Sequence, residues 1–210
     1  MKKLPIIFFA LTLTALVNNC SANEKYLEPR FFDVNQGRET AATQVLPRLQ
    51  ESRLILVGEH HTDKDHHTAQ LRVIQMLHNA GANVSIGMEM FSNDSQRSLD
   101  RWISGDIGDA EFQEIYYNNW NFHWKFYSSI LEYARDKKIP IVGLNVPREI
   151  TRQVARQGFQ SLSETQKDTL SQITCRVDKE YMEYIRKAYG GHVHGDLSFI
   201  YFCEAQLVWD

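Results

Sequence analysis

The sequence predicts an α/β fold with a mostly parallel sheet and flanking helices. Short apolar segments alternate with amphipathic segments of ten or more residues, which is the pattern of βαβ crossovers. The chain contains no internal repeat, low-complexity segment or Gly/Ser linker that would divide it. Its 43% hydrophobic and 23% charged residues are typical of a globular protein rather than a disordered or fibrous one.

Three strands are expected, each from a short apolar run. The first covers residues 54–57, Leu-Ile-Leu-Val, and ends at Gly58. The second covers residues 84–91, and the third covers residues 140–145. Because helical segments separate these runs, we expect the strands to be connected by right-handed crossovers and to lie parallel.

The first helix is expected over residues 64–80. Leu71, Ile74 and Leu77 lie on one stripe of this helix, and Gly81 provides a C-cap signal. Further helices are expected over residues 95–103, 109–118, 124–136, 148–157, 164–173, 178–188 and 196–209.

The first residues have the pattern of an export signal. Lys2 and Lys3 precede an apolar run over residues 4–17. This run is shorter than the roughly 20 residues that a membrane-spanning helix needs, which favours the apolar region of a signal peptide. We therefore predict a signal peptide over residues 1–19.

Two processing sites compete after this signal. Cys20 has the position of a lipidated cysteine, which predicts an exported lipoprotein of the bacterial envelope, anchored to the outer membrane by palmitate-type acyl chains. Cleavage after Ala22 is the alternative. Residues 20–49 then form an anchor segment and lead-in, and residues 50–210 form the domain. Because an apolar periodic pattern runs up to Trp209 without a cap, we expect a fragment of a longer protein.

The charge and the cysteine content narrow the possible functions further. The formal net charge is −3, with no clustered basic excess, so nucleic-acid binding is excluded. Cys175 and Cys203 follow the predicted signal, and either a disulfide or a pair of buried thiols is compatible with the sequence.

Polar side chains follow the predicted strands. Glu59 and His61 come after the first strand, Glu89 lies at the end of the second, and Asn145 and Arg148 follow the third. Because ligands of parallel α/β sheets bind at the carboxyl ends of strands, these residues are expected in one cleft. A histidine with two carboxylates forms an acid/base or ligand cluster. The alternative is that Glu59 caps the next helix and His61 is solvated.

Histidines and aspartates interleave at the start of the first predicted helix: His60, His61, Asp63, Asp65, His66 and His67. Asp63 and His67 are i, i+4 neighbours, so a metal site is one hypothesis. The favoured interpretation is a solvated helix start, because acidic side chains suit a helix N-terminus.

Residues 116–127 are unusually rich in aromatic side chains. Trp124, Tyr127, Leu131 and Ala134 fall on one helical stripe, which indicates core packing. The alternative is an aromatic wall for a large planar ligand such as haem, with a tyrosine or histidine as iron ligand. No Cys-x-x-Cys-His sequence occurs, so any haem is bound non-covalently.

A loop framed by glycines over residues 190–195 carries His192 and His194. Two interpretations stay open: the loop folds onto a bound ligand, or it is a plain connection.

An ordered set of motifs resembles the ChaN-like family. The motifs are LILVGEHHTDKDHHTAQLRVIQML, GMEMF, WKFYSSILEYA, NVPREI, GHVHG and EAQLVWD. They run from about residue 50 to the end of the sequence. Members of this family are haem-binding bacterial lipoproteins, related in fold to the Tiki and erythromycin esterase superfamily.

This resemblance implies haem uptake, with two haems face to face at a homodimer interface and a tyrosine on each iron. Carried onto this sequence, the haem-binding candidates are Tyr127, Tyr117, Tyr116, His61, His194 and Arg148. Lys125 is a second candidate for pairing with the propionates. We expect a binding protein rather than an enzyme. The superfamily offers the alternative of a hydrolase or metalloenzyme using Glu59, His61 and Glu89.

Overall fold

The computed structural model describes residues 30–170, 175–188 and 196–209, with side chains from residue 198 in the last range. The strands and first helices are β1 (Phe31–Asp33), β2 (Arg38–Thr40), α1 (Ala42–Glu51), α2 (Lys64–Asn79), β3 (Ile86–Ser92), η1 (Asn93–Ser95), α3 (Gln96–Ser104) and α4 (Asp109–Asn119). Then come η2 (Trp124–Phe126), α5 (Ser128–Lys137), β4 (Ile141–Asn145), α6 (Arg148–Gln157), η3 (Phe159–Ser161), α7 (Glu164–Thr169), α8 (Lys179–Ala188) and α9 (Asp196–Trp209). The predictions for Cys20 and for the loop of His192 and His194 concern residues outside the described ranges.

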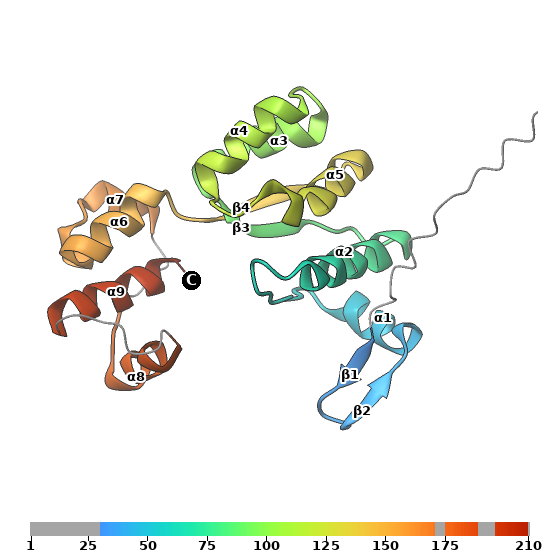
Figure 1. The fold of residues 1–210 in the computed structure, drawn as a ribbon, viewed down its shortest axis with the longest axis horizontal. Coiled ribbons are helices and arrows are strands. Elements are labelled where there is room, and N and C mark those ends of the chain that lie inside the picture. The colour runs from blue at the N-terminus through green and yellow to red at the C-terminus, as the bar shows by residue number, and fades with distance from the viewer. Residues whose placement is uncertain (1–29, 171–174, 189–195, 210) are drawn as a thin grey trace, which may run out of the picture.

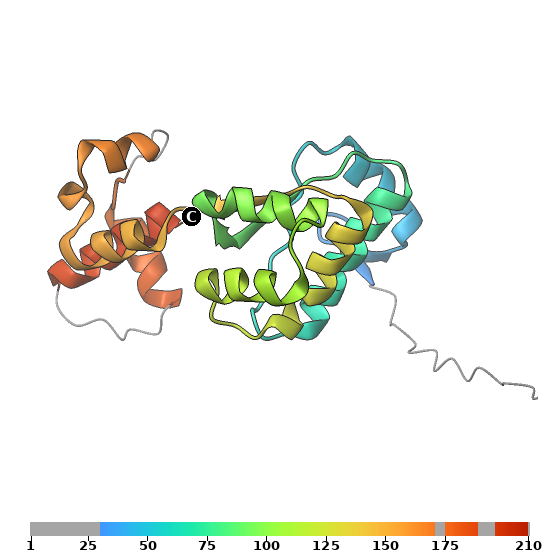
Figure 2. The same cartoon turned by 90° about the horizontal axis from the view of Figure 1, so that it is seen from above.

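The elements form two groups (Figure 1). One group contains the strands and α1 to α5, and the other contains α6 to α9. The view from above shows the second group beside the first, joined by the chain that leaves β4 (Figure 2). Within the described ranges, no helix has the length and apolar character that crossing a bilayer requires.

Parallel pairing is present between β3 and β4. Ile86 is in register with Ile141, and Gly87 with Val142. Helices α3 to α5 connect the two strands, which confirms the α/β class. The prediction of a mostly parallel sheet is not confirmed, because the other pair in the described residues, β1 with β2, is antiparallel.

The prediction of a first strand over residues 54–57 is wrong. Residues 54–57 are assigned no strand, and Leu54 and Leu56 are 75% and 85% exposed. The apolar run predicted a strand covered on both faces, but burial of this kind requires a paired neighbour and a covering layer. Here the segment instead leads into the loop that carries Glu59 and His61.

Most helices lie where the hydrophobic pattern predicted them. Helix α6 covers residues 148–157 as expected, and Gly81 follows α2 with φ of +79°, the left-handed conformation that a glycine C-cap signal predicts. The helix expected over residues 124–136 is divided in two. The His123 side chain accepts a hydrogen bond from the Lys125 backbone and begins the short η2, and Tyr127 separates η2 from α5.

The main core lies where α3, α4 and α5 pack with β3 and β4. Trp102 stacks on Phe112 with ring centroids 4.2 Å apart, and its indole nitrogen donates to the Leu131 carbonyl over 3.1 Å. Tyr116 and Tyr127 are fully buried in the same cluster. The core-packing interpretation of the aromatic segment is therefore confirmed for these two side chains.

The second group has its own core between α6 and α9 and contacts the first through stacked indoles. Trp209 of α9 lies 6.2 Å from Trp120 between ring centroids. Cys175 and Cys203 are both free thiols, so the described residues hold no disulfide between them. Burial raises the pKa of the Cys175 thiol to about 11, which keeps it protonated and unreactive.

Candidate functional site

A buried carboxylate lies at the centre of the strand-end region. The Glu59 side chain is 7% exposed, and other side chains contact both of its carboxylate oxygens. Its Oε1 accepts a hydrogen bond from the Tyr127 hydroxyl and lies 2.7 Å from His61 Nδ1. Its Oε2 lies 2.8 Å from Nδ1 of the buried His67. Because an unpaired buried carboxylate is costly, these partners hold the group in place.

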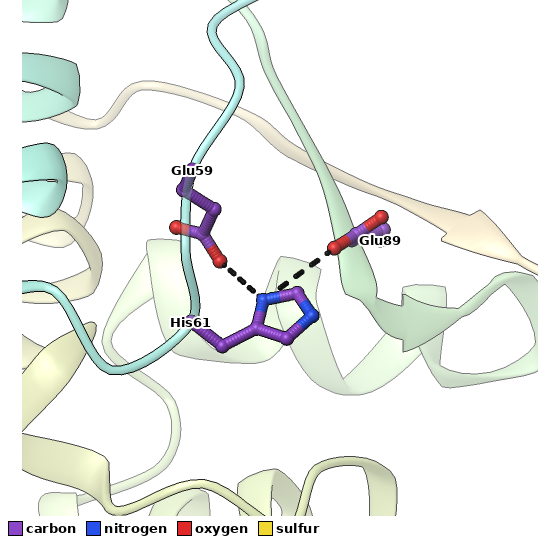
Figure 3. Close-up of side chains that lie close together, drawn as sticks. All are labelled: Glu59, His61 and Glu89. Atoms are coloured by element: carbon purple, nitrogen blue, oxygen red, sulfur yellow. Dashed lines mark hydrogen bonds and ion pairs between the residues drawn. The ribbon is translucent and has the colours of Figure 1, made fainter. Parts of the chain in front are cut away.

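His61 lies between two carboxylates (Figure 3). Its Nδ1 is 2.7 Å from Glu59 Oε1 and 4.0 Å from Glu89 Oε1. One ligand atom from each of the three residues lies within 4.8 Å of the others. The prediction that these residues meet is confirmed. The alternative in which Glu59 caps the next helix is wrong, because Asp63 caps α2.

The start of α2 divides into a solvated side and a buried side. The Asp63 carboxylate accepts a hydrogen bond from the Asp65 backbone over 2.9 Å, and this bond lowers the pKa of Asp63. The expected solvated helix start is therefore confirmed at Asp63 but wrong at His67, which is 4% exposed. The His67 ring faces Glu59, and its Nε2 is 3.1 Å from the His61 carbonyl.

The role of His67 was missed from the sequence, although a signal for its burial existed. His67 lies four residues before Leu71 and seven before Ile74, on the apolar stripe of α2. Leu71 and Ile74 pack against the main core. The contact of Glu59 with Tyr127 had no local signal, because 68 residues separate the two along the chain.

The three candidate tyrosines lie in different environments. Tyr127 is fully buried, and both burial and the hydrogen bond to Glu59 raise its pKa. Tyr116 is also fully buried, donates to the Phe122 carbonyl over 2.9 Å, and has its pKa raised by burial. Tyr117 is 44% exposed, and its oxygen accepts a hydrogen bond from the Trp124 backbone N–H over 3.1 Å.

Two candidate propionate partners lie near the same end of α4. Arg148 donates to the carbonyl of Asn118, the residue after Tyr117, over 3.3 Å. Lys125 follows Trp124, the residue whose N–H the Tyr117 oxygen accepts. Lys125 also borders a recess with a cavity volume of about 770 Å³, lined by His60, Thr62, Asp63, Lys64, Asp65, Lys125 and Phe126.

Comparison with known proteins identifies one family and one related structure. The family described as "Haem-binding uptake, Tiki superfamily, ChaN" matches residues 45–210. The structure described as "Cofacial heme binding to ChaN of Campylobacter jejuni" is similar with a TM-score of 0.66 and 18% identity, over 85% of this chain and 71% of that one. At this identity the likeness shows the shared fold alone. No curated protein matches the chain.

Proposed function

The chain belongs to the haem-binding uptake family of ChaN in the Tiki superfamily, and from this premise we propose that it binds haem non-covalently as cargo in bacterial haem and iron acquisition. The family match over residues 45–210 carries the proposal. The role proposed is binding and delivery rather than catalysis.

Tyr117 is the proposed iron ligand. A tyrosine ligates haem iron through its phenolate oxygen, so the ligand must lose its proton. The Tyr117 oxygen is exposed and accepts the Trp124 N–H rather than donating to a carboxylate, so an iron ion can approach it from solvent. Tyr116 and Tyr127 are less suited, because burial raises the pKa of both phenols and Tyr127 also faces a carboxylate.

Arg148 and Lys125 are the proposed partners of the haem propionates. Arg148 contacts the backbone next to Tyr117, and Lys125 follows the residue to which Tyr117 is hydrogen-bonded. A guanidinium holds a carboxylate through two parallel hydrogen bonds, whereas an ammonium acts as a point charge. The partly buried rings of Trp124 and Phe126 offer apolar contact for the porphyrin near these groups.

Assembly and location are proposed from the family and the sequence. Cofacial haem is described for the Campylobacter ChaN structure, and this supports a homodimer in which two bound haems face each other. We further propose that a histidine, His61 or His194, ligates the iron or forms a hydrogen bond on the other face of the haem. Lipidation at Cys20 would tether the dimer to the outer membrane.

A haemin titration tests the proposal. The chain from Ser21 onward is titrated while the Soret absorbance is followed, and the molar mass is measured on a sizing column before and after. A saturable Soret shift at about one haem per chain, with a doubling of mass, supports haem uptake by a dimer. Uptake that does not saturate, with no change in mass, contradicts it.

A further inference from the structure

We propose that the hairpin of β1 and β2 is a contact surface for a phospholipid membrane with anionic headgroups. The hairpin consists of two strands of three residues, and within the described residues it pairs with no other strand. It lies beside α1 and projects away from α3 and α4 (Figure 1). The haem proposal uses none of its residues, so this surface goes beyond that function.

Two apolar side chains of the hairpin are exposed to solvent. Phe32 is 59% exposed, and Val34, directly after β1, is 83% exposed. Because side chains alternate along a strand, these two share one face, whereas the buried Asp33 lies on the other. Both also line one recess of about 510 Å³ beside α1. They therefore form a continuous apolar patch, which marks an interaction site more often than single exposed residues do.

Polar contacts beneath the hairpin hold this patch outward. Asp33 Oδ1 accepts a hydrogen bond from the Gln36 backbone N–H over 3.0 Å. Its Oδ2 accepts a hydrogen bond from the Arg48 guanidinium, which belongs to α1, over 2.6 Å. Turning Phe32 inward would expose Asp33 and break both bonds. The exposure of Phe32 is thus built into the hairpin.

Arginine side chains surround the apolar patch. Residues 30–50 contain three arginines against two carboxylates, in a chain whose net charge is −3. Both carboxylates are paired, one with Arg30 and one with Arg48, and these two arginine side chains are 78% and 62% exposed. A guanidinium binds phosphate oxygens through several N–H groups, and its apolar stem can lie along a membrane while the charge stays among the headgroups. An apolar patch with a cationic border is typical of surfaces that bind at a membrane interface.

The place of the hairpin in the chain favours a membrane over a soluble partner. This step rests on the lipidation proposed at Cys20. Cys20 precedes Arg30 by ten residues, and an extended chain spans at most about 3.6 Å per residue, so the hairpin lies within roughly 36 Å of the anchor. A tether of this length keeps the patch at a high local concentration near the lipid, so even a weak contact is populated. A second point of contact would also fix the orientation of the anchored domain.

Vesicle binding by the chain from Ser21, which lacks Cys20, tests the surface without the lipid anchor. The vesicles contain phosphatidylethanolamine and phosphatidylglycerol, and the bound fraction is measured by flotation at low salt over a series of lipid concentrations. We expect the parent to float with the vesicles. Phe32→Ser is expected to lower the partition coefficient roughly fivefold or more, because it removes the larger apolar side chain of the patch.

Three further variants make the test specific. Phe32→Trp should bind at least as tightly as the parent, because an indole suits the membrane interface. Val34→Ser should weaken binding in the same direction as Phe32→Ser. Tyr184→Ser is the matched control, since Tyr184 is 68% exposed on α8, and it should bind like the parent. All four positions changed are exposed, so circular dichroism should show parental folding.

Absence of vesicle binding in the parent would overturn the proposal. So would Phe32→Ser floating as well as Tyr184→Ser does. A haem-free dimer that Phe32→Ser converts into a monomer, with no vesicle binding, would assign the patch to a second copy of the chain and also overturn it.

A haemin titration of the same proteins separates this proposal from the haem proposal. A parent that takes up haemin but does not float with vesicles disproves the membrane surface alone. A parent that floats with vesicles but takes up no haemin supports the membrane surface while the haem proposal fails.

Discussion

Tyr117 and Tyr127 belong to the same aromatic segment but differ in exposure and in hydrogen-bond role. Tyr127 is fully buried and donates a hydrogen bond to Glu59, whereas Tyr117 is 44% exposed and accepts one from a backbone N–H. The first arrangement stabilises the neutral phenol and raises the pKa of Tyr127, whereas the second leaves the Tyr117 oxygen open to solvent. The comparison teaches that exposure and hydrogen-bond partner, rather than residue type, distinguish the two tyrosines, and this difference supports the proposal of Tyr117 as the iron ligand.

The helical repeat explains why Tyr117 faces outward. On α4, adjacent residues differ by about 100° around the axis, so Tyr117 lies on a different face from the fully buried Tyr116. Tyr127 lies instead at the start of α5, where its ring is 4.5 Å from the His67 ring between centroids. This places its hydroxyl beside Glu59.

Replacing Glu59, the buried partner of Tyr127, is expected to cause the largest loss of stability. Glu59→Ala leaves the Tyr127 hydroxyl without its acceptor and removes the carboxylate beside His61 and His67, and an unsatisfied buried donor costs about 1–3 kcal/mol. Urea unfolding measures this loss of the free energy of unfolding. Glu132→Ala on exposed helix surface is the control, with an expected change of about 0.5 kcal/mol or less. Equal stability of the two variants would contradict the role given to Glu59.

Replacing Tyr117 should remove haem binding while sparing the fold. Tyr117→Phe deletes the proposed iron ligand, and we expect haemin affinity to fall roughly 30-fold, or about 2 kcal/mol, with loss of the tyrosinate charge-transfer band. Absorbance titration measures both. The exposed Tyr184 provides a matched control, and Tyr184→Phe should bind haemin like the parent.

Replacing Tyr127 should give the opposite result. Tyr127→Phe removes one donor to Glu59, so the free energy of unfolding should fall by about 1–2 kcal/mol. Its haemin affinity should stay at the parental value. If Tyr127→Phe instead loses haemin while Tyr117→Phe keeps it, the iron ligand is Tyr127 and the assignment is reversed.

Alkaline pH should destabilise the protein through its buried tyrosines. Burial raises the pKa of Tyr116 and Tyr127 above the ordinary value of 10.0 in the folded state. Above that pH the unfolded chain releases protons that the folded chain keeps, so stability falls as pH rises. At half a pH unit above 10.0, each tyrosine contributes a loss of about 0.8 kcal/mol. Unfolding measured at pH 8 and pH 10.5 should show a smaller loss in Tyr127→Phe; an unchanged loss would contradict the buried phenol.

The sequence predicted helices well because their signals are local. The stripe of Leu71 and Ile74, with glycine after it, placed α2 within one residue of its end. The run over residues 54–57 was misread because an apolar run predicts burial only where other segments cover it. The hairpin of β1 and β2 was not foreseen, since each strand has only three residues.

Within the candidate site, the sequence by itself predicted that Glu59, His61 and Glu89 meet, and they do. The prediction used a first strand that the described residues lack, so only the place of Glu89 on β3 followed from the expected element. The tertiary structure alone decided that Tyr127 and His67 hold Glu59. The physical reason is that local spacing sets which way a side chain points along its own element. The partner it meets, such as Glu59 for Tyr127, depends on packing between segments far apart in the chain.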